Sequence, residues 1–200
     1  MAKRLFDLII STCGLIVAGP IIVALALAVR IDSSGPAFFR QIRVGRGGKL
    51  FTVLKIRSMY FSPDGCGPPL TGANDSRITA IGSVLRGTKL DELPQLINVL
   101  RGEMSLVGPR PELPRYVEAY PDDLRKIILS VRPGITDEAS IEFRNEDKML
   151  GDLAGAEAKY IQEILPRKLE LYARYARENT FLGDLRILMR TFFAIVLDRT

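Results

Sequence analysis

The stretch that decides the fold runs through residues 87–102, GTKLDELPQLINVLRG, and continues over residues 103–111 as EMSLVGPRP. Apolar side chains in it follow the i, i+3, i+4, i+7 spacing of one helical face: Leu93, Leu96, Ile97 and Leu100. This spacing predicts an amphipathic helix that ends at the closing glycine. Pro94 lacks a backbone N–H and is tolerated only in a first helical turn. The helix is therefore predicted to begin close to Asp91 or Glu92, which places two carboxylates at its positive end.

These two carboxylates have two competing interpretations. In the first, Asp91 is an N-cap and Glu92 is an ordinary acid of the first turn. In the second, the helix dipole and the unpaired N–H groups favour ionised carboxylates, which makes Asp91 a usable nucleophile. Arg86 and Lys89 precede the pair, and Arg110 follows between two prolines. Flanking cations suit a reaction in which a phosphate approaches an anionic nucleophile.

Residues 90–111, LDELPQLINVLRGEMSLVGPRP, resemble without a gap the core motif of the bacterial sugar transferases, the polyprenyl-phosphate phosphoglycosyl transferases. In these enzymes the Asp of the Asp-Glu pair attacks the β-phosphate of a UDP-sugar, and UMP leaves. The enzyme then holds the phosphosugar until a polyprenyl phosphate takes it. The resemblance implies that Asp91 is the nucleophile and a Mg²⁺ ligand, that Glu92 is its acid-base neighbour, and that Arg110 contacts phosphate. The flanking Arg86 is also expected to bind the substrate.

Composition limits the other classes of function. The chain has 200 residues, a net charge of +5, two cysteines and no histidine. Its length fits one compact domain, and its charge favours an anionic partner, which could be nucleic acid, a phosphorylated metabolite or an anionic membrane. Without histidine, Ser-His-Asp, Cys-His and His-ligated metal chemistry are excluded. Cys13 and Cys66 have neither the density nor the spacing of a disulfide framework or a zinc site, which favours a reducing compartment.

The N-terminal segment is apolar, and residues 8–29 carry no charge. That length is about enough to cross a bilayer. A signal peptide, a spanning helix and a re-entrant helix compete as interpretations. The run is long for a signal peptide. Pro20 follows Gly19 near the middle and predicts a kink, and basic residues lie on both flanks, which favours entry and exit by the same face. The resemblance implies a re-entrant helix, although a serine commonly precedes the proline in the small monotopic members.

Two β-rich runs, residues 37–44 and 49–59, flank a glycine-rich turn and predict a hairpin. A phosphate cradle at residues 45–48 is disfavoured because the surrounding P-loop and Rossmann patterns are missing. Strand alternation would place Lys55 and Arg57 on one face, where a solvated edge is the ordinary explanation. These runs are similar to the family's pattern, with Ile56 in place of the usual aromatic. The resemblance implies that Lys55 and Arg57 contact the donor diphosphate or support Asp91.

The C-terminal half is predicted to be helical after a long loop at residues 61–75. Short helices are expected near residues 78–85, 112–119 and 122–131, and a helical region is expected over 154–195 with interruptions at Pro166 and Gly183. The last helix is amphipathic and basic, so it either packs on the core or lies among lipid headgroups.

Between these helices, the segment beginning Arg132-Pro133-Gly134 predicts a type II turn. It is similar to a Pro-Gly-Ile-Thr segment of the family. This implies that Arg132, Thr136 and Asp137 line the sugar-nucleotide pocket. Asp137 and Glu138 could equally cap the next helix.

Together these features predict a mostly helical α+β fold. Residues 1–31 form a re-entrant membrane helix, and residues 32–200 form a cytoplasmic catalytic domain with a small hairpin and interfacial helices. The implied activity is transfer of a sugar-1-phosphate from a UDP-sugar to undecaprenyl phosphate at the bacterial inner membrane, as the first membrane step of glycoconjugate biosynthesis. Mg²⁺, membrane lipids and a possible homodimer are expected, and nucleic acid is not. The alternatives are a membrane-tethered anion-binding protein without catalysis and a phosphatase. The sugar stays open.

Overall fold

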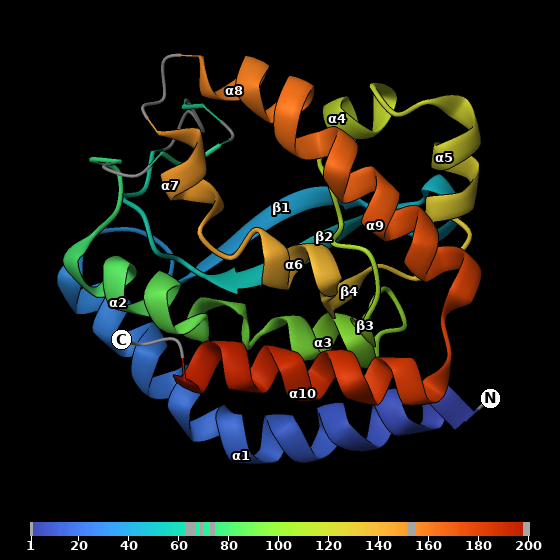
Figure 1. The fold of residues 1–200 in the computed structure, drawn as a ribbon. Helices are drawn as coiled ribbons and strands as arrows, with labels where there is room; N and C mark the ends of the chain where they lie inside the picture. Colours follow the sequence, from blue (N-terminus) through green and yellow to red (C-terminus); the bar gives the residue numbers. More distant parts are fainter. Residues whose placement is uncertain (1, 63–66, 69, 73–74, 152–154, 198–200) are drawn as a thin grey trace.

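The computed structural model describes residues 2–62, 67–68, 70–72, 75–151 and 155–197. In this part of the chain, helices surround two small sheets (Figure 1), and the predicted mostly helical α+β fold with a long apolar first helix and a small hairpin is confirmed. The elements are α1 Ala2–Asp32, β1 Phe38–Val44, η1 Arg46–Gly48, β2 Leu50–Ile56, α2 Ala80–Thr88, η2 Leu90–Glu92, α3 Gln95–Leu100, β3 Ser105–Val107, α4 Pro114–Glu118, α5 Asp122–Ile128, β4 Gly134–Thr136, α6 Glu138–Glu142, α7 Glu146–Leu150, α8 Ala156–Lys159, η3 Tyr160–Ile164, α9 Leu165–Glu178 and α10 Phe181–Leu197.

The predicted hairpin is confirmed as the antiparallel pair β1 and β2, in which Phe38 lies opposite Ile56 and Val44 lies opposite Leu50. Its turn is short and left-handed at Gly47 and Gly48, whose φ angles are 68° and 78°. Glycine suits this turn because other residues are strained at positive φ. The hairpin separates two layers: α1, α2, α3 and α10 lie on one side, and α4, α5, α8 and α9 lie on the other (Figure 1).

A second sheet was not predicted. It consists of β3 and β4, which pair in parallel with Ser105 opposite Gly134 and Val107 opposite Thr136. The backbones meet so closely that a Cβ added to Gly134 would lie 2.1 Å from the Gly108 nitrogen. Strands of three residues are too short for a period-two pattern, and their pairing joins segments far apart in the chain. The segment starting at Pro133, where the sequence predicts a turn, therefore leads directly into β4.

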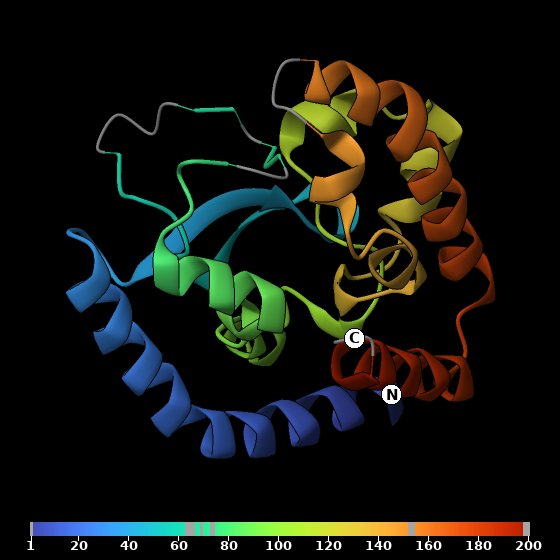
Figure 2. The same ribbon diagram turned by 60° about the vertical axis from the view of Figure 1, so that its left-hand side comes forward.

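The break at Pro20 that the family resemblance implied is wrong, because α1 is one helix of 31 residues with Pro20 inside it. Among the described residues it is the one helix long and apolar enough to cross a membrane. Figure 2 shows it curving beneath α2 and α3. Ala18 and Ile22, which flank Pro20, are buried against the rest of the chain. This packing offsets the backbone hydrogen bond that the proline removes, and a bent helix tolerates the loss.

The first turns of α1 are polar and bind the second sheet. Asp7 accepts hydrogen bonds from the Ser105 hydroxyl at 2.8 Å and from the Leu106 N–H at 3.2 Å. Lys3 donates to the Val107 carbonyl at 3.1 Å and forms an ion pair with Asp184 of α10. The N-terminal end of this apolar helix is therefore fixed to β3 and α10.

The other end of α1 is fixed by Arg57. Its guanidinium is buried and donates to the Pro36 carbonyl at 2.7 Å and to the Ser33 hydroxyl and carbonyl, each at 2.9 Å. The α2 backbone at Ile81 also donates to the Asp32 carboxylate at 3.4 Å. Both ends of the apolar helix are thus bound to the same body.

The C-terminal helices depart from the prediction at two positions. Pro166 lies in the first turn of α9, where its missing N–H costs little, and the π-helical turn η3 runs directly into it. Gly183 lies inside α10, and the chain breaks earlier, at Asn179 and Thr180. The Thr180 hydroxyl accepts a hydrogen bond from the Gly183 N–H at 3.1 Å, which is a cap interaction that starts α10. The short helices α4 and α5 agree with the prediction within a few residues.

Candidate active site

The site is built on the start of α3. The backbone remains right-handed helical from η2 through Leu93 and Pro94 into α3. Residues four and three apart then share a face, which aligns Asp91, Gln95 and Asn98. All three are buried, at 6%, 1% and 0% exposure.

The apolar face predicted for α3 is only half-buried: Leu93, Leu96, Ile97 and Leu100. On this side α1 approaches closely, since a Cβ added to Gly14 would lie 3.2 Å from Leu96 Cδ1. The sequence therefore predicted the amphipathic helix correctly but not which face points to the interior. The apolar side of α3 packs instead against the apolar surface of α1.

Asp91 has no partner among the described residues. Its Oδ1 atom is completely covered and accepts no hydrogen bond. Buried carboxyl oxygens are ordinarily paired because an unpaired one loses its hydration without compensation. An orphaned oxygen of this kind is expected where a ligand completes the site.

Both carboxylate oxygens of Glu92 accept hydrogen bonds from cationic side chains. Its Oε1 atom accepts from Lys55 Nζ at 2.9 Å and from Arg110 Nη2 at 2.5 Å, and its Oε2 atom accepts from Arg110 Nη1 at 3.3 Å. Lys55 comes from β2, and Arg110 follows β3. Glu92 thereby holds two cations from two different sheets beside Asp91.

The pKa values of the two neighbouring carboxyl groups are shifted in opposite directions. Burial raises the pKa of Asp91 above its ordinary value, and the positive charge of Lys55 offsets this only in part. Burial would also raise the pKa of Glu92, but the charges and hydrogen bonds of Arg110 and Lys55 outweigh it and hold that pKa well below the ordinary value. The helix-start interpretation expected a lowered pKa for Asp91, but burial outweighs the neighbouring positive charges and raises it.

Asn98 ties this face to the hairpin. Its Nδ2 donates to the Thr52 carbonyl at 2.7 Å and to Glu103 Oε2 at 2.6 Å, and its Oδ1 accepts from the Leu54 N–H at 3.1 Å. These bonds fix the part of β2 that carries Lys55. Sequence analysis missed Asn98, although a polar residue one position from the apolar stripe is a usable signal.

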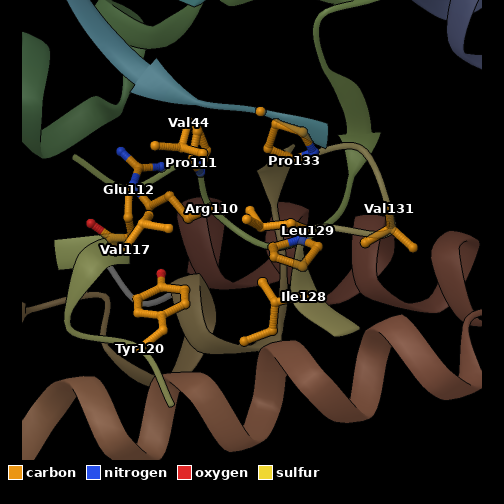
Figure 3. Close-up of a pocket in the computed structure, with 12 residues that line it drawn as sticks. Val44, Arg110, Pro111, Glu112, Val117, Tyr120, Ile128, Leu129, Val131 and Pro133 are labelled. Carbon is orange, nitrogen blue, oxygen red and sulfur yellow. The ribbon is translucent and has the colours of Figure 1, made fainter. Parts of the chain in front are cut away.

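A small cavity lies behind Arg110, lined also by Tyr120, Leu129 and Pro133 (Figure 3). Its volume is about 20 Å³, which is room for roughly one water molecule. Asp91 is not among the residues that line this cavity.

The sequence profile of the family described as bacterial sugar transferase matches residues 1–198. The chain belongs to the bacterial sugar transferase family. A UDP-glucose:undecaprenyl-phosphate glucose-1-phosphate transferase of Caulobacter vibrioides is 34% identical to it over 193 residues, covering 96% of this chain and 68% of the relative. The enzyme of the same name in Escherichia coli is 37% identical over 196 residues, covering 96% of this chain and 40% of the relative. An undecaprenyl-phosphate galactose phosphotransferase of Salmonella typhimurium is 42% identical over 159 residues, covering 72% of this chain and 33% of the relative.

This sugar transferase family member brings together some of the residues predicted for the site. Asp91, Glu92, Lys55 and Arg110 meet through the contacts above, and the charge of Arg86, in the last turn of α2, also acts on Asp91. These residues reach the site from three separate parts of the chain.

Asp137 lies nearby, but its carboxylate caps α6 by accepting from the Ser140 N–H at 2.7 Å. This confirms the helix-cap alternative. Burial raises the pKa of Asp137, and the charge of Arg110 acts against that shift.

The structure places three other predicted residues elsewhere. Arg57 holds the end of α1, as described above. Arg132 Nε donates to the Gly102 carbonyl at 2.9 Å, past the end of α3 opposite Asp91. The Thr136 hydroxyl lies 2.8 Å from that of Thr191 in α10. Their side chains are therefore occupied by structural contacts, and a part in donor binding stays a prediction.

The side chains of the site can be compared with the ligands that the expected Mg²⁺ requires. Among the described residues no group of three His, Cys, Asp or Glu side chains gathers as a metal site. Mg²⁺ is commonly held by one or two carboxylates together with substrate phosphates, so such a cluster is not required. Glu92 has no free oxygen for it, whereas the covered, unpartnered oxygen of Asp91 fits one carboxylate ligand.

Proposed function

We propose that this chain transfers a sugar-1-phosphate from a UDP-sugar to undecaprenyl phosphate and releases UMP. Membership of the bacterial sugar transferase family and the activities of its named relatives support this substrate pair. The observation that carries the proposal is the buried, unpartnered carboxylate of Asp91, with Lys55, Arg86 and Arg110 around it.

In the first step Asp91 attacks the β-phosphorus of the donor. A bond forms between its carboxylate oxygen and that phosphorus, and the bond to the bridging oxygen breaks, so that UMP leaves with the bonding pair. The surrounding cations reduce the repulsion between the carboxylate and the diphosphate. Mg²⁺, held by Asp91 and the donor phosphates, would supply further charge neutralisation on the leaving group.

Glu92 has a positioning role in this scheme. Its carboxylate is ionised and both oxygens are occupied, so it has no proton to give and is poorly suited to receive one. It instead fixes Lys55 and Arg110 at a defined distance from Asp91. This role replaces the acid-base role implied by the family resemblance.

In the second step the lipid phosphate attacks the aspartyl phosphosugar. Its oxygen forms the new diphosphate bond, and Asp91 leaves as the free carboxylate. The charges balance, because a dianionic phosphate and a monoanionic phosphodiester give a diphosphate and a carboxylate. No proton donor is needed for this step.

The membrane arrangement follows from α1. A helix with both ends bound to one domain has both ends on one side of the bilayer, so we propose that residues 1–31 enter and leave by the cytoplasmic face of the inner membrane. The remaining residues, 32–200, would form the catalytic domain on that face. Among the described side chains of α10, five large apolar ones are also exposed, which fits a helix lying among headgroups: Phe181, Leu182, Met189, Phe192 and Phe193.

The test is labelling of the protein by a sugar-labelled UDP-sugar in the presence of Mg²⁺ and without lipid. We expect wild type to be labelled and Asp91→Asn to be unlabelled, while Asp122→Asn, which changes an exposed aspartate, keeps the label. Labelled Asp91→Asn protein would remove Asp91 from this role. A panel of UDP-sugars assayed for UMP release, beginning with UDP-glucose, identifies the sugar.

The same assay separates the alternatives. A phosphatase releases free sugar phosphate to water without lipid. A binding protein releases no UMP, and its affinity for anions falls steeply with salt.

A further inference from the structure

Lys89 has a backbone conformation that its side chain does not favour. Its φ and ψ are 59° and 17°, which makes it the one non-glycine residue with positive φ in the described part of the chain. It occupies the position after α2 where helices commonly place glycine, and its N–H donates to the carbonyls of Arg86 and Leu85. Strained residues of this kind are concentrated at functional sites.

The Lys89 side chain is exposed and makes no hydrogen bond or ion pair with any residue that the structure describes. It nevertheless lies close enough to Asp91 for its charge to act on that carboxyl. Lys55 and Arg110, by contrast, share the negative charge of Glu92. Among the described residues, neither Lys89 nor Arg86 forms an ion pair with a carboxylate, unlike Lys55 and Arg110.

The position of Lys89 relative to the apolar helix indicates which phosphate it would meet. Leu85 and Leu90, on either side of it in the chain, pack with Val29 and Leu25 of α1. α1 also carries exposed apolar side chains, such as Leu27 at 60% exposure. Lys89 thus lies in a chain segment that packs on the apolar helix, whereas Lys55 lies on β2 and Arg110 follows β3.

We propose that Lys89 binds the phosphate of the polyprenyl acceptor and holds it against the phosphosugar on Asp91. This inference rests on the proposed function. The ammonium forms a charge-assisted contact to a non-attacking oxygen of the acceptor phosphate and keeps its proton throughout.

The test uses the full chain with Lys89→Gly, Lys89→Asn and Lys89→Arg, and with Lys49→Ala as an exposed control lysine in the hairpin turn. Two quantities are measured: UMP released in a single turnover with donor alone, and the KM for undecaprenyl phosphate in detergent micelles. Loss of one charge-assisted contact should raise that KM roughly ten- to hundred-fold for Gly and Asn. Donor-only release should stay unchanged, and Arg should restore the KM to within about three-fold.

Folding is controlled in the same series, because glycine and asparagine tolerate left-handed φ. Lys89→Gly should therefore have a Tm equal to or above that of wild type, so that a weaker acceptor KM cannot come from unfolding. An unchanged acceptor KM in both neutral variants overturns the proposal, as does a weaker donor interaction with unchanged acceptor KM. If wild type itself releases no UMP from donor alone, the proposed covalent function fails instead.

Discussion

Replacing Glu92 by glutamine removes the one anion that Lys55 and Arg110 share. The side chains are 12%, 21% and 30% exposed for Glu92, Lys55 and Arg110, so the cluster is mostly withdrawn from water. Removing one partner of a buried ion pair costs about 3–5 kcal/mol because the remaining charge is uncompensated. For a chain of this size, that corresponds to a fall in Tm of about 6–20 °C.

The effect should depend on pH in a defined direction. The pKa of Glu92 is lower in the folded chain than in the unfolded chain, so its stabilisation is present above the unfolded value of about 4.3 and is lost as pH falls through the folded value. The difference in Tm between wild type and Glu92→Gln should therefore be complete at pH 7. It should shrink progressively as pH falls below about 4.3.

The assay is thermal unfolding in detergent micelles, followed by circular dichroism. Glu157→Gln is the matched control, since it breaks the Arg115–Glu157 pair, whose side chains are 47% and 49% exposed. Exposed pairs contribute at most about 1 kcal/mol. The double variant Glu92→Gln with Lys55→Met should recover part of the loss, because one uncompensated cation is removed. If Glu92→Gln is no less stable than Glu157→Gln, the interpretation of Glu92 as a buried positioning anion is refuted.

Two further predictions concern the residues that support the site. Asn98→Ala leaves the Leu54 N–H and the Thr52 carbonyl unpaired, so it should lower the free energy of unfolding by about 2–5 kcal/mol. The change is measured as a shift in Tm, and a Tm within 1–2 °C of wild type (roughly 0.5 kcal/mol) would contradict this prediction. Gly134→Ala would force a methyl group to within 2.1 Å of the Gly108 backbone and should separate β3 from β4, with loss of UMP release; retained activity would show that this pairing is not needed to position Arg110.

Much of the fold could be predicted from local pattern. α1 follows from a charge-free apolar run, the hairpin from β-rich runs around a glycine turn, and the helix carrying Leu96 from apolar periodicity, all of which depend on residues close together in the chain. The break at Pro20 was implied by the family resemblance and is absent, since packing of Ala18 and Ile22 supports the helix across the proline. Local rules give the cost of a residue but not the contacts that offset it.

The candidate site divides in the same way. The Asp-Glu pair and its flanking cations are visible in a short motif, so Asp91, Glu92 and Arg110 could be named in advance. Arg57 was grouped with Lys55 by strand alternation, but β2 ends at Ile56 and its guanidinium turns to the end of α1. Because β2 ends before Arg57, this residue does not share the surroundings of Lys55.

The sequence by itself determined the family, the helix that begins near Asp91 and the presence of a long apolar segment, because each is encoded in contiguous residues. Only the tertiary structure decided that Asp91 is desolvated and unpartnered while Glu92 is ionised between Lys55 and Arg110. The protonation of a carboxyl depends on burial and on charges within a few ångströms. Those neighbours come from β2 and from the segment after β3, which meet only when the chain folds.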